Sequence, residues 1–84
     1  MTDKTKYEIQ RGERAAQILA EPILVDALDT IEQEYMTRWK NSPVRDADGR
    51  EKLWLMVMTL HRFRVELVQV METGQVARAT LAQQ

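Results

Sequence analysis

The chain has 84 residues, of which 12 are Lys or Arg, 13 are Asp or Glu, 44% are hydrophobic and none is cysteine. This length allows one domain, residues 1–84, and a lone chain of this size buries only about 60–65% of the surface that its unfolded form exposes. The lack of cysteine excludes disulfides and thiolate metal sites. The formal net charge of -1 excludes a global field that attracts nucleic acid or anionic lipid. A polar start and an apolar run no longer than residues 53–58 predict a soluble protein with no secretory signal and no membrane contact.

A first helix is predicted over residues 5–20. Thr5 and Glu8 have the spacing of a capping box, in which each side chain accepts a hydrogen bond from a backbone N–H, and Asp3 is an alternative cap. Gly12 lies inside this stretch and costs about 1 kcal/mol relative to Ala in a helix. We therefore expect the first turns to fray.

A second helix is predicted over residues 22–40. Pro22 suits the first turn of a helix, where its missing N–H has no intrahelical partner. Apolar residues follow at helical spacing, and basic residues near the end complement the helix dipole. Pro43 then disfavours helical geometry at the residue before it, so residues 41–48 should form a loop.

A third helix is predicted over residues 49–73, with Asp46 or Asp48 as its cap. Gly74 should end this helix, because glycine readily adopts the left-handed conformation that stops many helices. Residues 75–84 then form either a short helix or a loose tail.

The third helix is apolar on more than one face. In a soluble protein such a helix is buried on more than one side, and the second helix alone cannot cover it. Met56 and Met58 fill the core or form an adaptable contact surface. We therefore expect a homo-oligomer, or another protein bound to this surface. The residues predicted to form the interface are Leu53, Trp54, Val57, Leu60, Phe63, Leu67 and Met71.

Few residues suggest catalysis. His61 is the only histidine, and without a cysteine or a second histidine near it we expect a structural role between helices, hydrogen-bonded to a carboxylate of the second helix. Residues 21–34 contain five acids and no base: Glu21, Asp26, Asp29, Glu32 and Glu34. We expect them to form a solvated face or a docking face for a basic partner. No phosphate-binding loop, dinucleotide turn or nucleophile elbow occurs, so we expect no enzyme activity, no cofactor and no metal.

Basic residues gather around the predicted loop, at one end of a closed hairpin: Arg38, Lys40, Arg45, Arg50 and Lys52. Arginines beside Trp39 and Trp54 can bind phosphate or stack on bases. Acidic residues are interleaved with them, however, and both tryptophans are in phase with the apolar stripes. We favour tryptophans packed in the core at the loop end with local ion pairs, and keep nucleic-acid contact and protein contact as alternatives.

Several segments carry a pattern of their own: WKNSPVRD at 39–46, GREKLW at 49–54 and ETGQVA at 72–77, with weaker support at 11–16 and 19–28. Together they resemble a group of small proteins encoded by tailed bacteriophages and prophages. The resemblance covers most of the chain and implies a role in virion structure or assembly, among head and packaging functions. It implies a location in the host cytoplasm or in the virion, and it brings no catalytic residues.

The sequence therefore predicts an all-α fold, an antiparallel helical hairpin with an additional N-terminal helix that is folded across it or extended as an arm. We expect a non-enzymatic phage protein that acts by helix-mediated self-assembly or by binding another phage protein. One alternative is a small nucleic-acid-binding or DNA-packaging accessory that uses the basic cluster. Another is an inhibitor of a host protein that presents the acidic face of the second helix.

Overall fold

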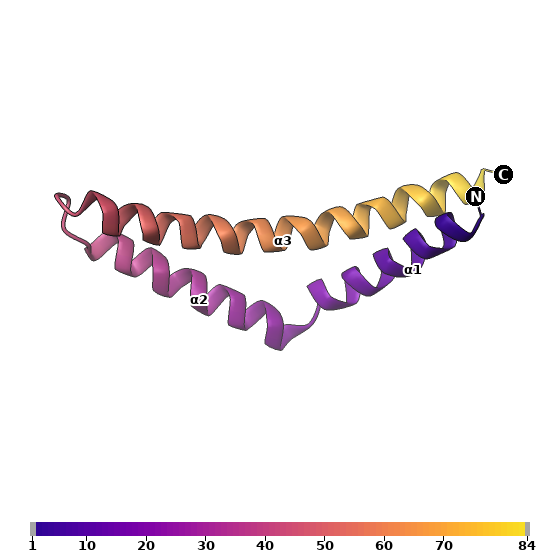
Figure 1. Cartoon of the computed structure of the whole chain (residues 1–84). Helices are drawn as coiled ribbons and strands as arrows, with labels where there is room; N and C mark the ends of the chain where they lie inside the picture. Colours follow the sequence, from indigo (N-terminus) through magenta and orange to yellow (C-terminus); the bar gives the residue numbers. More distant parts are fainter. Residues whose placement is uncertain (1, 84) are drawn as a thin grey trace. The chain divides into compact units, whose positions relative to one another are not determined.

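Three helices make up almost all of the described chain. The computed structural model describes residues 2–83, which form α1 (Thr2–Leu19), α2 (Pro22–Asn41) and α3 (Ala47–Ala82) and contain no strand (Figure 1). The predicted all-α fold is confirmed. None of the helices between residues 2 and 83 has a stretch long and apolar enough to cross a membrane.

The chain divides into two compact units. The first, which we call the hairpin unit, is Pro22–Phe63 and contains α2 with the first part of α3. The second, the crossing unit, contains α1 with the part of α3 from Arg64 onward. Each unit is therefore built around one stretch of the same helix.

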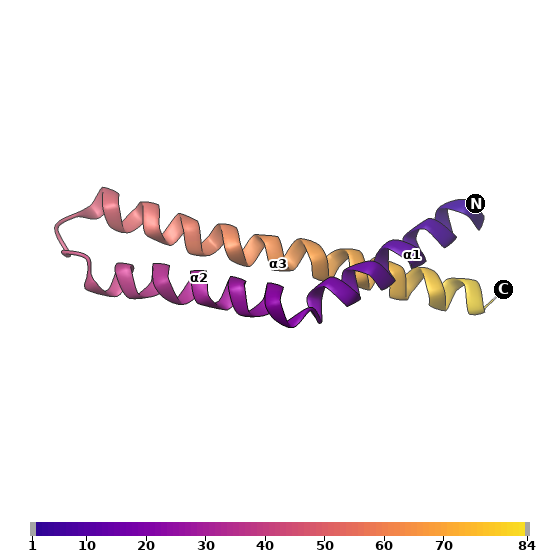
Figure 2. The same cartoon turned by 90° about the horizontal axis from the view of Figure 1, so that it is seen from below.

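In the hairpin unit, α2 and the first part of α3 run antiparallel (Figure 2). Ser42 ends α2 by donating its hydroxyl to the carbonyl oxygen of Trp39 at 2.6 Å. The backbone N–H of Gly49 donates to Oδ1 of Asp46 at 3.1 Å, which is the N-cap bond that starts α3. Asp46 is thus confirmed as the cap, and the loop is shorter at both ends than predicted because α2 reaches Asn41 and α3 begins at Ala47.

In the crossing unit, α1 lies across the last part of α3 (Figure 2). Gly12 of α1 and Gly74 of α3 meet where the helices cross, and a Cβ atom placed on Gly12 would lie only 2.7 Å from the Cα of Gly74. Ala15 and Ala77 are 3% and 7% exposed. The backbones approach this closely because small residues leave no side chain between them.

Two predicted helix ends are wrong. α3 continues through Gly74 to Ala82, and no described glycine has a positive φ, so Gly74 does not stop the helix. Residues 75–82 of the predicted tail are helical and form the last turns of α3, and residue 84 lies outside the described residues. The second wrong end is the start of the first helix. α1 begins at Thr2, so Thr5 is inside the helix and does not cap it.

Candidate functional site

The contact between α2 and α3 in the hairpin unit centres on Val57. Its side chain is 8% exposed, and it is the one buried hydrophobic residue among those described in this unit. Nearer the loop, the rings of Trp39 and Trp54 pack with their centroids 6.3 Å apart and their planes tilted by 47°. Trp54 nevertheless remains 46% exposed. The core of the hairpin unit is therefore thin.

Large apolar side chains of α3 remain exposed around this thin core. Their exposed fractions run from 39% to 55%, and they are Trp54, Leu55, Met56, Met58 and Phe63. The buried hydrophobic residues of the described chain are only Ala15, Val57 and Ala77. Exposed apolar side chains that gather on one element are candidates for an interaction surface.

One group of these side chains forms a row along α3. Met56, Leu60 and Phe63 follow one another at steps of four and three residues, so at 3.6 residues per turn they lie on one side of the helix, next to the face of Val57. Met56 and Phe63 are exposed and Leu60 is half-buried. We call these three residues the Met56 row.

The remaining exposed apolar residues of α3 lie on other faces. Trp54 and Met58 fall on the opposite side of Val57 from the Met56 row. Leu55 points away from α2, on the face that also carries the exposed charges of Glu51 and Arg62. The apolar surface is thus continuous along the flanks of α3 and interrupted by charge on its outer face.

The Met56 row belongs to a longer series with coiled-coil spacing. Steps of three and four residues alternate through Leu53, Met56, Leu60, Phe63, Leu67, Val70, Gly74, Ala77 and Leu81. In the crossing unit Gly74 and Ala77 of this series are buried, whereas in the hairpin unit Met56 and Phe63 are exposed. The alternating spacing is the signal that identifies Met56 as part of the exposed row, and the predicted interface omitted this residue.

The predicted interface residues have different surroundings. Val57 is buried within the hairpin unit, Leu53 and Leu60 are half-buried there, and Trp54 and Phe63 are exposed. The other two predicted residues, Leu67 and Met71, are half-buried in the crossing unit. The structure therefore leaves Trp54 and Phe63 most accessible to a partner.

Arg50, predicted as a phosphate contact, is bound within the loop end of the hairpin unit. Its guanidinium carbon lies 4.4 Å from the centroid of the Trp39 ring. Its Nη1 donates to the carbonyl oxygens of Trp39 and Ser42 at 3.0 and 3.1 Å and to the Ser42 hydroxyl at 2.9 Å. Arg50 thus joins the end of α2 to the start of α3, and one terminal nitrogen of its guanidinium, Nη1, is directed at the protein.

The other members of the predicted basic cluster are exposed. Arg38 lies over the ring of Tyr35 at 5.8 Å, and Lys40, Arg45 and Lys52 are on the surface around the loop. Arg50 is the half-buried residue of the cluster, and its hydrogen bonds are made within the loop end. The rest of the cluster is exposed. A phosphate at this end would meet separate exposed cations.

His61 is exposed on α3. The prediction that it lies between helices against a carboxylate of α2 is therefore wrong. His61 lies on the same side of α3 as Trp54 and Met58, which are also exposed.

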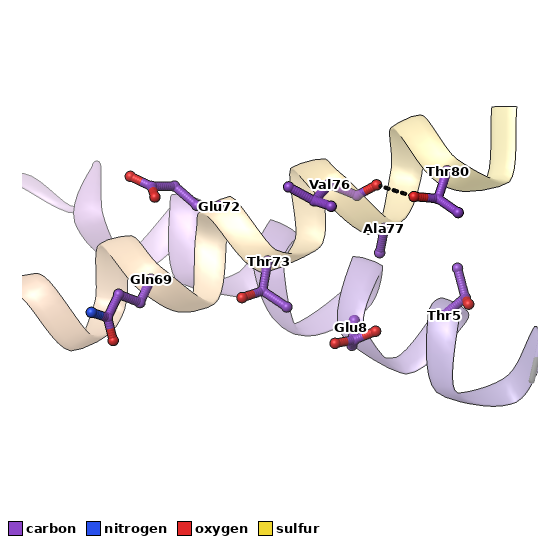
Figure 3. Close-up of a pocket in the computed structure, with 8 residues that line it drawn as sticks. All are labelled: Thr5, Glu8, Gln69, Glu72, Thr73, Val76, Ala77 and Thr80. Carbon is purple, nitrogen blue, oxygen red and sulfur yellow. Dashed lines mark hydrogen bonds between the residues drawn. The ribbon is translucent and has the colours of Figure 1, made fainter. Parts of the chain in front are cut away.

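A groove of about 530 Å³ in the crossing unit is a candidate small-molecule site (Figure 3). Thr5 and Glu8 line it from α1, and Ala77 points toward them from α3. Its lining includes the carboxylates of Glu8 and Glu72 together with neutral polar groups. Within residues 2–83, no group of three or more His, Asp or Glu side chains is placed to hold a metal ion.

Comparison with known proteins adds no relative. No protein-family model, no curated protein and no solved structure matches the chain.

Proposed function

We propose that this protein is not an enzyme and acts by helix-mediated association, first with further copies of itself. The observation that supports this is the exposure of large apolar side chains along α3 in the hairpin unit, Met56 and Phe63 among them. These side chains are about half exposed, so completing their burial would stabilise the protein by about 1 kcal/mol for each. Association is the means by which a chain of this size recovers that free energy.

We further propose that the association serves virion structure or assembly in a tailed bacteriophage. This part rests on the resemblance of residues 39–46, 49–54 and 72–77 to small phage proteins. The protein would then occur in the host cytoplasm before assembly or in the particle after it. Mass spectrometry of purified particles separates the two locations.

Light scattering on the purified chain tests self-association. We expect a mass that is a multiple of 9.8 kDa at micromolar concentration and that falls on dilution. A monodisperse monomer at high micromolar concentration contradicts the proposal. A monomer that gains mass only when another phage protein is added assigns the same surface to that partner.

The exposed cations around the loop support nucleic-acid binding as a second candidate. Lys40, Arg45 and Lys52 remain available there, whereas Arg50 is held by the loop. Binding of this kind would weaken steeply with salt and with replacement of Arg45. No retention on DNA at low salt contradicts it. The third candidate, inhibition of a host protein by the acids of α2, requires a complex that is lost when Asp26 is reversed to Lys.

A further inference from the structure

One face of α2 points away from the contact with α3 in the hairpin unit. Leu28 and Tyr35 are half-buried on one side of α2, whereas Thr30, Gln33 and Thr37 are exposed on the opposite side. A groove of about 590 Å³ lies on this exposed side, between residues 29 and 38. We call this side the Thr37 face.

Two acids and two bases border the Thr37 face, with one acid and one base on each edge. Asp29 and Lys40 are separated by three helical turns and share one edge, while Glu34 and Arg38 are one turn apart on the other. All four are exposed. On both edges the acid precedes the base, and the midpoints of the two pairs lie within two residues of each other, next to position 35.

Exposed apolar side chains lie at the two ends of α2. Ile23, in its first turn, is 78% exposed, and Val44, in the loop that follows it, is 87% exposed. Position 35 is again close to the middle between them. Charge and apolar exposure are thus arranged so that a two-fold axis at position 35 would make α2 complementary to itself.

We propose that the Thr37 face of α2 is the contact of an antiparallel, two-fold symmetric dimer of this chain, with the axis next to position 35. The proposal rests on the self-association proposed above and adds a contact surface and an orientation on α2. A two-fold axis perpendicular to both helices reverses their direction and keeps each edge of the face on its own side. Asp29 therefore meets Lys40 of the partner subunit along one edge.

The other edge is complementary in the same way. Glu34 meets Arg38 of the partner subunit, and the symmetry makes every pair occur twice. The axis also brings Val44 of the partner subunit to the end of α2 that carries Ile23. Exposed ion pairs contribute little affinity one by one but determine the orientation, and covering the apolar side chains at both ends adds to the affinity.

A parallel dimer through the same face would be repelled. Each acid would then lie beside the same acid of the partner subunit, and each base beside the same base. The charge pattern therefore selects the antiparallel arrangement.

A charge swap tests the contact between Glu34 and Arg38. E34R would place two arginines together at both symmetric contacts and should weaken dimerisation by about tenfold or more. R38E should weaken it as well, and it also loses the contact with the Tyr35 ring. The double variant E34R/R38E restores opposite charges across the axis, so it should dimerise more tightly than either single variant. Light scattering over a dilution series measures the dissociation constant, and circular dichroism follows the helix content.

Glu51 provides the matched control. It is exposed in the same unit but lies on α3, away from the Thr37 face. E51R changes the net charge by as much as E34R does and should leave the dissociation constant unchanged. A loss of dimer in both variants would assign the effect to net charge and overturn the proposed contact.

Introduced cysteines test the orientation without changing a charge, because the chain contains none. Thr30 and Asn41 are both exposed, share one side of α2 and lie on opposite sides of the axis. T30C and N41C mixed together should form a mixed disulfide about ten times faster, or more, than either variant forms one with itself. The reason is that a disulfide needs Cβ atoms about 3.5–4.5 Å apart, whereas identical positions would be about 16 Å apart. Mass spectrometry of the products identifies which chains are joined.

The outcomes separate this proposal from the one on which it rests. A monomer at high micromolar concentration overturns both. An oligomer that is unaffected by E34R and R38E overturns the contact on α2 and leaves self-association standing. A dimer in which T30C reacts fastest with itself is parallel and overturns the orientation. Failure of the double variant E34R/R38E to regain affinity while its helix content is intact overturns the pairing across the axis.

Discussion

The two units of this protein bury their helices in different ways. In the crossing unit, Gly12 and Gly74 bring the backbones of α1 and α3 into contact, and the small side chains of Ala15 and Ala77 are almost completely buried. In the hairpin unit, Val57 is the buried residue and larger side chains around it stay partly exposed. In both units α3 packs against a second helix, and these two helices, α1 and α2, have similar lengths.

The difference shows that small residues can close a two-helix contact when large ones do not. Where glycine faces glycine, backbone atoms of one helix fill the space against the other, and no side chain lies between them. Large side chains at a contact need neighbours on their remaining sides to become buried. We therefore expect the crossing unit to be sensitive to added volume, and the hairpin unit to depend on its loop and on association.

Adding volume at Gly74 should have the largest effect. In Gly74→Val, the new Cβ would lie 2.7 Å from the Cα of Gly12 and 2.9 Å from the carbonyl oxygen of Glu8. Both are backbone atoms that move only with α1, so we expect a loss of about 2–3 kcal/mol in the free energy of unfolding, even after the gain in helix propensity. Urea denaturation at one fixed protein concentration, followed by circular dichroism, measures it.

The neighbouring position is the control for this change. Gln75→Val introduces the same side chain at an exposed position of α3 and should change the free energy of unfolding by less than about 0.5 kcal/mol. Both tryptophans belong to the hairpin unit, so their fluorescence reports on that unit. Equal losses in the two variants would show that Gly74 does not depend on its contact with Gly12.

Removing Arg50 should have the next largest effect, in the hairpin unit. Arg50→Ala loses hydrogen bonds to Trp39 and Ser42 and the stacking on the Trp39 ring. We expect a loss of about 2 kcal/mol and a change in tryptophan fluorescence, because bonds from a charged donor are among the stronger ones. Arg45→Ala, in the exposed loop, should cost less than about 0.5 kcal/mol.

A conservative variant sharpens the interpretation of Arg50. Arg50→Lys keeps the charge and N–H donors but loses the planar guanidinium that lies over the Trp39 ring. If the geometry is decisive, Arg50→Lys should be nearly as destabilised as Arg50→Ala. Full stability with Lys would assign the effect to charge alone.

The sequence predicted the hairpin better than the crossing. The predicted second helix, 22–40, differs from α2 by one residue. The agreement is close because Pro22 and Pro43 restrict the backbone locally, whatever the rest of the chain does. Gly74 was interpreted by the same kind of local rule, as a helix stop, and this was wrong. A glycine that ends a helix and one that permits a close crossing look alike until the residue opposite, here Gly12, is known.

The candidate site was predicted only in part, for a similar reason. Apolarity on several faces of α3 correctly indicated exposed hydrophobic surface, including Trp54 and Phe63. It did not separate Val57, which α2 covers, from Met56, which it leaves exposed. Arg50 was grouped with the exposed cations because its acceptors are mainly backbone carbonyls, which are equivalent in every sequence until the loop is folded.

The cap of α3 gives a smaller expected effect. Asp46→Ala removes the side-chain acceptor for the N–H of Gly49 and should cost about 1 kcal/mol, again in the hairpin unit. Asp46→Asn keeps an acceptor at this position and should cost only a few tenths of that. Thermal denaturation resolves the difference, since 1 kcal/mol corresponds to about 4–8 °C in a domain of this size. Equal losses in both variants would mean that the charge of Asp46 matters and its cap bond does not.

The ion pair between Arg78 and Glu13 should have the smallest effect, although it joins α1 to α3. Its side chains are 63% and 55% exposed, so water screens the attraction and both long side chains lose freedom when they pair. Glu13→Gln and Arg78→Gln should each change the free energy of unfolding by about 0.5 kcal/mol or less, and the double variant should show little coupling between them. Denaturation at low and high salt measures this. A coupling free energy above about 1.5 kcal/mol would place the ion pair, and not the contact between Gly12 and Gly74, at the centre of the crossing unit, because an exposed pair cannot supply that much unless the packing around it depends on it.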